Sequence, residues 1–376
     1  MMRGERDLEA RLRRDALAVR SHAEPDAGFH HRIMARVSAT ATTQSSGRRS
    51  FRLVGQVAFA AGLIVVVLGF AVAVSRLNSS RTGYRNTGAP ALVGAMMAAD
   101  PVHRQVVVFG GGADPAAPKN DTWIWDGSSW KRQHPVGSPP ARSFGSMVFD
   151  AARGTIVLFG GTGASRPQSV NHNFNDTWIW DGAVWREAHS RQVPPATNGA
   201  AMTYDPALRM TVLLNAGATW LWDGVEWTEG LPAPPGMGHG PMAYAPATND
   251  VVALALSQAS GPVASTETWR FAGKPWSRQP GADLPAAGSP VLLAEDPATH
   301  TLIGVDGRGR TWSWNSSHWT IRNVNRTSTA AGSAMTYDPA RHLVLLYGGQ
   351  VSDNDNRPTS DLWAWDGNRW TLLQGG

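Results

Sequence analysis

The sequence of 376 residues contains no cysteine. Disulfides, cysteine nucleophiles, cysteine-ligated zinc and iron–sulfur clusters are therefore excluded. Tyrosine is scarce, with only five residues. No Ser-His-Asp order, phosphate-binding glycine loop or histidine metal spacing stands out. We therefore expect a protein that is not an enzyme and that has no cofactor and no metal centre.

Net positive charge is confined to the N-terminal part of the chain. Residues 1–90 carry fourteen arginines, no lysine and six acidic residues, which gives a net charge of +8. Residues 91–376 carry twenty lysines and arginines against twenty-three acidic residues, which gives −3. A nucleic-acid-binding domain needs clustered surplus cations. The C-terminal part therefore predicts no nucleic-acid partner.

One run of residues lacks charge altogether. Residues 53–75 have no charged side chain, and Gln56 is the only strongly polar one. As a helix this run would be about 34 Å long, which is enough to cross a bilayer core. Eleven arginines precede it and three follow it before residue 91, a bias that favours a cytoplasmic N-terminus. We expect a basic, partly helical cytoplasmic arm (1–52), a single-pass transmembrane helix (53–75), a linker (76–90) and an extracytoplasmic domain (91–376).

The N-terminal part has two other possible interpretations. The small residues Ala71-Val72-Ala73 are typical of a signal-peptide cleavage site, but the apolar run is too long and begins too late for one. The layout of a short helical arm, one span and an outer domain resembles that of membrane-bound anti-sigma factors. That resemblance implies a transmembrane sensor as an alternative function. The zinc-binding His-Cys-Cys pattern of many such factors is absent, so His30 and His31 inherit no metal role.

The seventeen tryptophans follow one repeated pattern. Within each copy the second aromatic residue follows the first by two positions, and the third follows the second by five. The copies are Trp123/Trp125/Trp130, Trp178/Trp180/Trp185, Trp220/Trp222/Trp227, Trp269/Phe271/Trp276, Trp312/Trp314/Trp319 and Trp363/Trp365/Trp370. Six copies at intervals of roughly fifty residues predict a repeat architecture. Because the tryptophans recur in every copy, we expect them in the core and not on sugar-stacking platforms.

Each repeat predicts four short strands. In the first repeat, the first strand ends in the turn signal Asp100-Pro101, and the second is the apolar run 106–109. Gly110-Gly111 follows, where backbone dihedrals or close approach exclude a side chain. The third strand carries two tryptophans on one face, and the hairpin signal Asp126-Gly127 leads into the fourth.

The di-glycine and the spaced aromatic residues resemble the Kelch repeat, which also builds the galactose oxidase propeller. This resemblance implies an all-β, six-bladed Kelch-type β-propeller, preceded by the arm and the transmembrane helix. Its repeats would span about 91–142, 143–197, 198–237, 238–286, 287–329 and 330–376. The sequence departs from the pattern in having tryptophan for tyrosine at the middle position and in losing the di-glycine in repeats three to five. The copper centre of galactose oxidase needs a cysteine and cannot form here.

The connections between second and third strands differ in length. Repeats one, two and six have long ones (113–122, 162–177 and 350–362), whereas those of repeats three and five are nearly absent. In a closed six-bladed ring these three loops become neighbours on one face, and loops on rigid scaffolds often carry function. The candidate binding residues are Lys119, Asn120, Arg166, Gln168, Asn171, His172, Asn173, Asp353, Asn354, Asp355, Asn356 and Arg357.

Residues 353–356 alternate aspartate and asparagine and could offer oxygens to calcium, although the glycine and the distal glutamate of an EF-hand loop are missing. The sequence as a whole predicts a non-catalytic, membrane-anchored binding or scaffold module displayed outside the cytoplasm, with a protein or glycan ligand that it does not identify. The alternatives are the transmembrane sensor and, second, a carbohydrate-active propeller enzyme.

Overall fold

The computed structural model describes residues 88–164, 172–234, 237, 240–256, 266–282, 284, 291–322, 331–350 and 357–375. These residues form six four-stranded antiparallel sheets and contain no α-helix. The predicted arm and transmembrane helix lie outside the described residues. Within the described part of the chain, no helix has the length and apolar character to cross a membrane.

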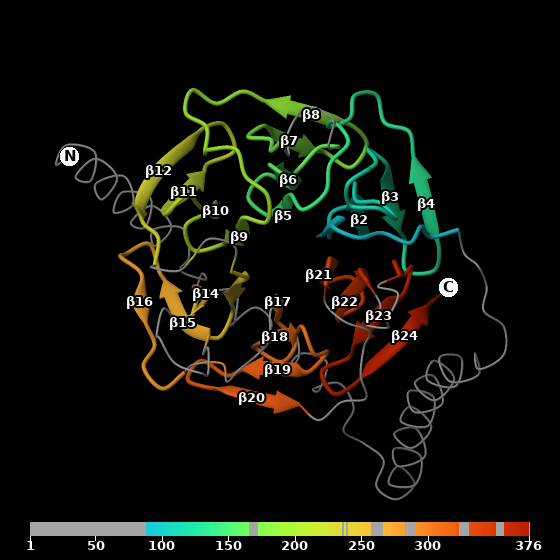
Figure 1. Ribbon diagram of the computed structural model, residues 1–376. Coiled ribbons are helices and arrows are strands. Elements are labelled where there is room, and N and C mark those ends of the chain that lie inside the picture. Colours follow the sequence, from blue (N-terminus) through green and yellow to red (C-terminus); the bar gives the residue numbers. More distant parts are fainter. Residues whose placement is uncertain are drawn as a thin grey trace, which may run out of the picture. The chain divides into compact units, whose positions relative to one another are not determined.

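Each sheet is one blade, and its strands follow one another in chain order (Figure 1). The strands are β1 (Met96–Asp100), β2 (Gln105–Phe109), β3 (Thr122–Trp125) and β4 (Trp130–Gln133) in blade 1; β5 (Ser146–Asp150), β6 (Thr155–Phe159), β7 (Thr177–Trp180) and β8 (Trp185–Ala188) in blade 2; β9 (Ala201–Asp205), β10 (Met210–Asn215), β11 (Ala218–Trp222) and β12 (Trp227–Pro232) in blade 3; β13 (Met242–Ala245), β14 (Asp250–Leu256), β15 (Thr266–Phe271) and β16 (Ser277–Arg278) in blade 4; β17 (Val291–Asp296), β18 (Thr301–Asp306), β19 (Thr311–Trp314) and β20 (Trp319–Arg322) in blade 5; and β21 (Ser333–Asp338), β22 (Leu343–Gly348), β23 (Leu362–Trp365) and β24 (Trp370–Gln374) in blade 6.

The six blades close into a ring. The first strand of each blade lies innermost and packs against the first strands of both neighbouring blades, and β21 packs against β1. The fourth strands, from β4 to β24, lie on the outside of the ring (Figure 1). The structure thus confirms the predicted all-β, six-bladed propeller.

The aspartate and the di-glycine that the sequence predicted at the turns of the first repeat lie at turns in the structure. The buried Asp100 ends β1, and its Oδ1 accepts the backbone N–H of His103 at 3.1 Å. The di-glycine after β2 has positive φ, 69° at Gly110 and 70° at Gly111. A Cβ on Gly110 would lie 2.4 Å from the carbonyl oxygen of Arg142, so only glycine fits.

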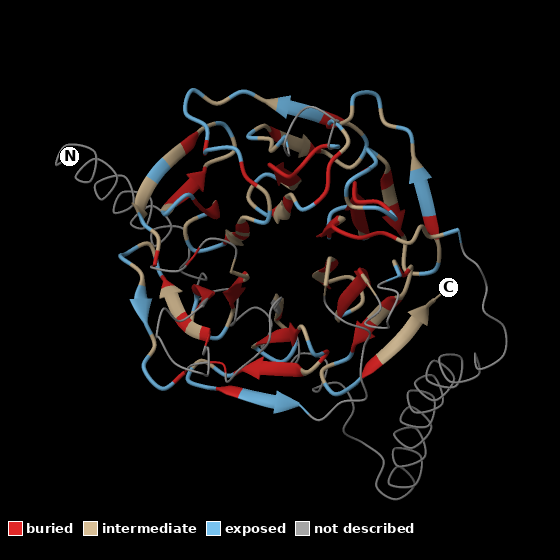
Figure 2. Cartoon of the chain, viewed as in Figure 1, coloured by how far each residue is buried: buried red, intermediate tan, exposed pale blue. Residues whose placement is uncertain are grey.

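The tryptophans form the core between the blades. Twelve of the seventeen are buried, and the other five are half-buried and packed against the core clusters. The second strands of the blades are almost wholly buried, and the fourth strands expose much of their length (Figure 2). The prediction that the tryptophans are core residues is therefore confirmed.

Hydrogen bonds between side chains link successive blades. The third aromatic residue of a blade's pattern is always a tryptophan, and in blades 2 to 6 it donates its Nε1–H to a threonine on the third strand of the preceding blade. The pairs are Trp185–Thr122 at 3.0 Å, Trp227–Thr177 at 2.8 Å, Trp276–Thr219 at 2.8 Å, Trp319–Thr268 at 2.9 Å and Trp370–Thr311 at 2.8 Å. Five of the six blade interfaces are joined in this way.

The sixth interface, between blades 6 and 1, closes differently. Leu362 takes the place of the threonine, and the buried Nε1 of Trp130 has no hydrogen-bond partner among the described residues. The Trp130 ring packs instead against Tyr347, with centroids 4.7 Å apart. The Tyr347 hydroxyl donates to the carbonyl of Pro90, and the carbonyl of Leu92 accepts the N–H of Gly349 at 2.7 Å. Residues 90–92, at the end of the predicted linker and the start of the predicted propeller, therefore close the ring.

Candidate functional site

The three long loops begin and end on one face of adjacent blades. In blade 1 the carbonyl of Lys119 accepts the N–H of Arg142, at 3.3 Å, from the connection that leads into blade 2. In blade 2 the carbonyl of Phe174 accepts the N–H of Thr197, at 3.0 Å, from the connection into blade 3. In blade 6 the N–H of Gly349 donates to the carbonyl of Leu92 in the N-terminal segment, as the N–H of Gly111 donates to the carbonyl of Arg142 in blade 1. We name three described segments of these loops, residues 113–121, 172–176 and 357–361, the loop sector.

The described candidate residues occupy the ends of the three loops. Lys119 and Asn120 are exposed in the first loop, His172 is exposed in the second, and Arg357 is exposed in the third. Asn173 is half-buried, and its Oδ1 accepts the hydroxyl of Thr162 at 2.7 Å, so this side chain helps to hold the loop. The remaining candidates lie outside the described residues: Arg166, Gln168, Asn171, Asp353, Asn354, Asp355 and Asn356.

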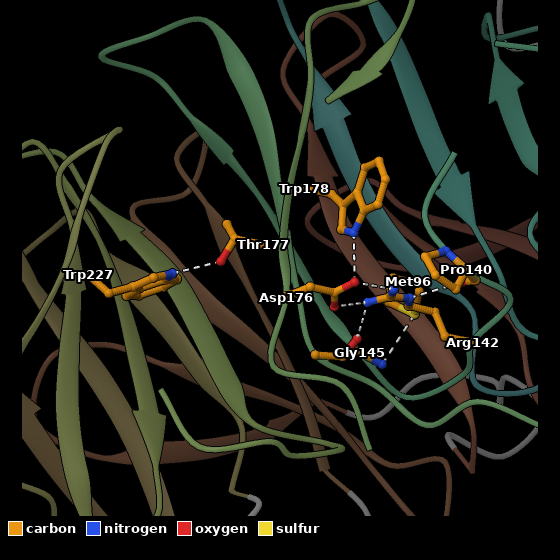
Figure 3. Close-up of polar contacts among 9 residues, drawn as sticks. Met96, Pro140, Arg142, Gly145, Asp176, Thr177, Trp178 and Trp227 are labelled. Carbon is orange, nitrogen blue, oxygen red and sulfur yellow. Dashed lines mark hydrogen bonds and ion pairs between the residues drawn. The ribbon is translucent and has the colours of Figure 1, made fainter. Parts of the chain in front are cut away.

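A buried ion pair, which the sequence reasoning missed, fixes the second loop (Figure 3). The fully buried guanidinium of Arg142 donates from its Nη atoms to both carboxylate oxygens of Asp176, at 2.6 and 2.7 Å. Its other bonds go to the carbonyls of Pro140, at 3.0 Å, and Gly160, at 2.9 Å. Trp178 Nε1 donates to Asp176 at 2.8 Å. The pair thus ties the loop to the connection between blades 1 and 2.

The electrostatics of this pair favour the charged form. Burial by itself would raise the pKa of Asp176, but the hydrogen bonds and the positive charge of Arg142 outweigh it and hold that pKa below its ordinary value. The guanidinium carbon of Arg142 also lies 4.0 Å from the ring centroid of Phe174. The exposed His172 packs edge-on against Phe174, with centroids 5.0 Å apart. The imidazole is therefore positioned by a rigid, buried support.

A channel runs along the axis of the propeller. The first strands of all six blades line a channel of about 590 Å³. One level of its wall consists of five methionines and a leucine: Met97, Met147, Met202, Met242, Leu293 and Met335. The next level, two residues further along each strand, consists of Ala99, Phe149, Tyr204, Tyr244, Glu295 and Tyr337. We name these the methionine level and the aromatic level of the channel.

The aromatic level carries the perturbed titratable groups of the channel. Burial raises the pKa of Glu295 to about 7 and is the main cause that raises the pKa of Tyr244 to about 12. The hydroxyl of Tyr244 donates to Asn249 Oδ1 at 3.0 Å, and that of Tyr337 is bonded to His342 Nδ1 at 3.1 Å. Both hydroxyls are thus bonded to the turns that follow, at positions 249 and 342.

Among the described residues, no three or more histidine, aspartate or glutamate side chains are grouped in a way that could hold a metal ion. The proposed calcium ligands at 353–356 lie outside the described residues and stay a prediction.

No protein-family model matches the sequence, and no curated protein matches it. Among solved structures, the propeller is similar to the SapL1 lectin in complex with α-methyl fucoside, with a TM-score of 0.51 and 13% sequence identity. The alignment covers 76% of this chain and 96% of the lectin. At this identity the likeness shows the fold, and it agrees with the six-bladed ring derived from the strands.

Proposed function

We propose that this chain is a non-catalytic, membrane-anchored binding module with a Kelch-type propeller outside the cytoplasm, and that it binds a carbohydrate through the loop sector. The observation that carries the proposal is the buried Arg142–Asp176 pair. Arg142 is fully buried and Asp176 is half-buried, and burying a charge is unfavourable unless it is well paired. Here such a pair lies at the base of an exposed loop. Such a support is expected where loop side chains must be held in place for recognition.

The chemistry of the exposed groups supports a carbohydrate ligand. Lys119, Asn120 and His172 offer an ammonium, an amide and an imidazole, which together can donate to and accept from sugar hydroxyls. The similar structure is that of a lectin in complex with α-methyl fucoside, which supports a carbohydrate as the class of ligand.

A glycan array tests the ligand class. The full-length chain, held in lipid nanodiscs and fluorescently labelled, should bind a defined subset of glycans. The triple variant Lys119→Ala, Asn120→Ala, His172→Ala should lose that binding at least tenfold. The matched control Lys274→Ala, Asn368→Ala, His318→Ala replaces the same residue types in exposed turns of the opposite face and should bind as the wild type does. Wild-type binding to no glycan, or equal loss in both variants, would contradict the proposal.

Protease accessibility tests the topology. The arginine-rich N-terminal part and the uncharged run predict that protease added to intact cells, or to spheroplasts where a wall intervenes, digests the propeller and spares the arm. Protection of the propeller until the membrane is permeabilised would contradict an extracytoplasmic propeller. That result would leave the glycan test of the loop sector unaffected.

A further inference from the structure

The aromatic level of the channel surrounds one carboxylate with aromatic rings. Glu295 is the one acidic side chain among the described residues that line the channel, and it shares its level with Phe149 and three tyrosines. No hydrogen bond or ion pair is made by Glu295 within the described part of the chain. Glu295 is half-buried, and its carboxylate lines the open channel. The channel therefore presents an unpaired negative group to whatever enters it.

The turns at this end of the channel add further negative charge. The buried aspartates that end β1, β5 and β21 each pair with a cationic side chain or a histidine, as in Asp150–Arg153. Asp205 and Asp296, which end β9 and β17, make no ion pair within the described residues. The Oδ2 atom of Asp205 is buried without a partner, and burial raises its pKa to about 6. At this end of the channel, in blades 3 and 5, the described residues thus provide no ion pair that balances the negative charge of Asp205 and Asp296.

The walls favour a ligand that is both cationic and apolar. Aromatic rings attract cations through the negative potential of their faces, and this attraction grows when the site excludes water. The methionine level adds flexible, polarisable apolar side chains that adapt to different shapes. The volume of about 590 Å³ lies in the range typical of small-molecule sites. An anionic ligand would meet Glu295 and the uncompensated aspartates, and a neutral ligand would leave Glu295 unpaired.

We propose that the channel is a second binding site, distinct from the loop sector, that takes an organic ammonium ion with an apolar body. The ammonium head lies at the aromatic level beside Glu295, and the apolar body lies among the methionines. This site is independent of the proposed carbohydrate site, which lies on loops that do not line the channel.

Calorimetric titration of the full-length chain in nanodiscs tests this inference, with empty nanodiscs as the blank. The probes share one aromatic ring and differ in charge: benzyltrimethylammonium, benzyl alcohol and benzenesulfonate. The cation should bind at pH 8 at least tenfold more tightly than benzyl alcohol, and benzenesulfonate should not bind. Equal binding of the cation and the alcohol would mean that the channel is an apolar cavity without preference for a cation, which contradicts the inference. No binding of the cation would also overturn it.

Glu295→Gln removes the charge and keeps the shape. It should weaken binding of the cation tenfold or more, whereas Glu187→Gln, at an exposed position on the outer strand β8, should not. Since Glu295 must lose its proton to pair with the cation, affinity should rise roughly thirtyfold from pH 5.5 to pH 8 for a group with a pKa of about 7. This dependence should vanish in Glu295→Gln.

Other titratable groups near Glu295 have to be separated from it. Tyr204, Tyr244 and Tyr337 line the same level, and His342 lies at its end. The tyrosine hydroxyls stay protonated below pH 8, so two groups must be separated from Glu295: His342, the histidine that lines the channel, and Asp205, whose pKa burial raises to about 6. His342→Gln and Asp205→Asn should each keep the pH dependence of binding. If either variant removes the dependence and Glu295→Gln keeps it, the assignment of the ammonium partner to Glu295 is wrong.

Discussion

The hydrogen bond between Trp227 and Thr177 gives a measurable test of how the blades are held together. Trp227 on β12 of blade 3 donates to Thr177 on β7 of blade 2 at 2.8 Å, and both side chains are at least 98% buried. Thr177→Val keeps the shape of the side chain and removes the acceptor. The indole N–H is then left buried and unpaired, which costs about 1–3 kcal/mol.

For Thr177→Val we expect a cost in the lower half of this range. The ring already tolerates an unpaired indole N–H at Trp130, and valine contributes an apolar methyl group in place of the hydroxyl. We therefore predict a loss of about 1–2 kcal/mol in the free energy of unfolding. Thermal melting of the full chain followed by tryptophan fluorescence is the assay, with Thr320→Val, at an exposed strand position, as the control.

A double-mutant cycle with Trp227→Phe isolates the bond itself. Phenylalanine lacks the N–H donor, so Thr177→Val should cost less in that background, and the two substitutions should couple by about 1 kcal/mol. If Thr177→Val is as neutral as Thr320→Val, or if its cost is unchanged in the Trp227→Phe background, the bond does not stabilise the blade interface and the reasoning fails.

Three further predictions concern the core, a buried acid and the ring closure. Trp180→Ala should cost about 3–5 kcal/mol and reduce hydrogen-exchange protection in blade 2 and both neighbours; unchanged melting with loss of glycan binding would instead favour a sugar-stacking role. Burial raises the pKa of Asp205 to about 6, so the folded protein loses stability as pH rises from about 4 to 6 and this carboxyl group ionises. Asp205→Asn should therefore raise the melting temperature at pH 7.5 more than at pH 4, and an equal rise at both pH values would contradict this prediction. Tyr347→Phe removes the bond to Pro90 and should speed hydrogen exchange in residues 88–94 while blade 4 is unaffected; equal change in both would argue against a local closure.

Most of the fold could be predicted from the sequence because its signals repeat. The tryptophan spacing places the third and fourth strands, and turn signals such as Asp100-Pro101 and Asp126-Gly127 place the bends between strands. Each signal acts locally, through turn dihedrals or strand alternation, and six copies reinforce one another. The ring closure was not predictable in this way, since Leu92 lies before the first strand, β1, and its partner Gly349 lies in the last repeat.

The candidate site was less predictable. Arg142 and Asp176 lie 34 positions apart, and the pair belongs to one blade only, so no repeated pattern marks it. The backbone position that Arg142 has after blade 1 is taken by Thr197 after blade 2 and by Leu92 before blade 1. The residues that line the channel do follow a pattern in the sequence: they lie one and three positions before the aspartate that ends an innermost strand. Glu295 stands out there as an acid among aromatic residues, but alternation alone does not tell which face of an innermost strand lines a channel.

Hydrogen exchange of the full chain with and without its best array glycan tests most directly the claim that this propeller is a binding module that works through the loop sector. The account predicts slowed exchange in residues 113–121, 172–176 and 357–361, on adjacent blades, with no change in the turns on the opposite face. Slowed exchange confined to those opposite turns, or to loops of blades 3 to 5, would contradict it.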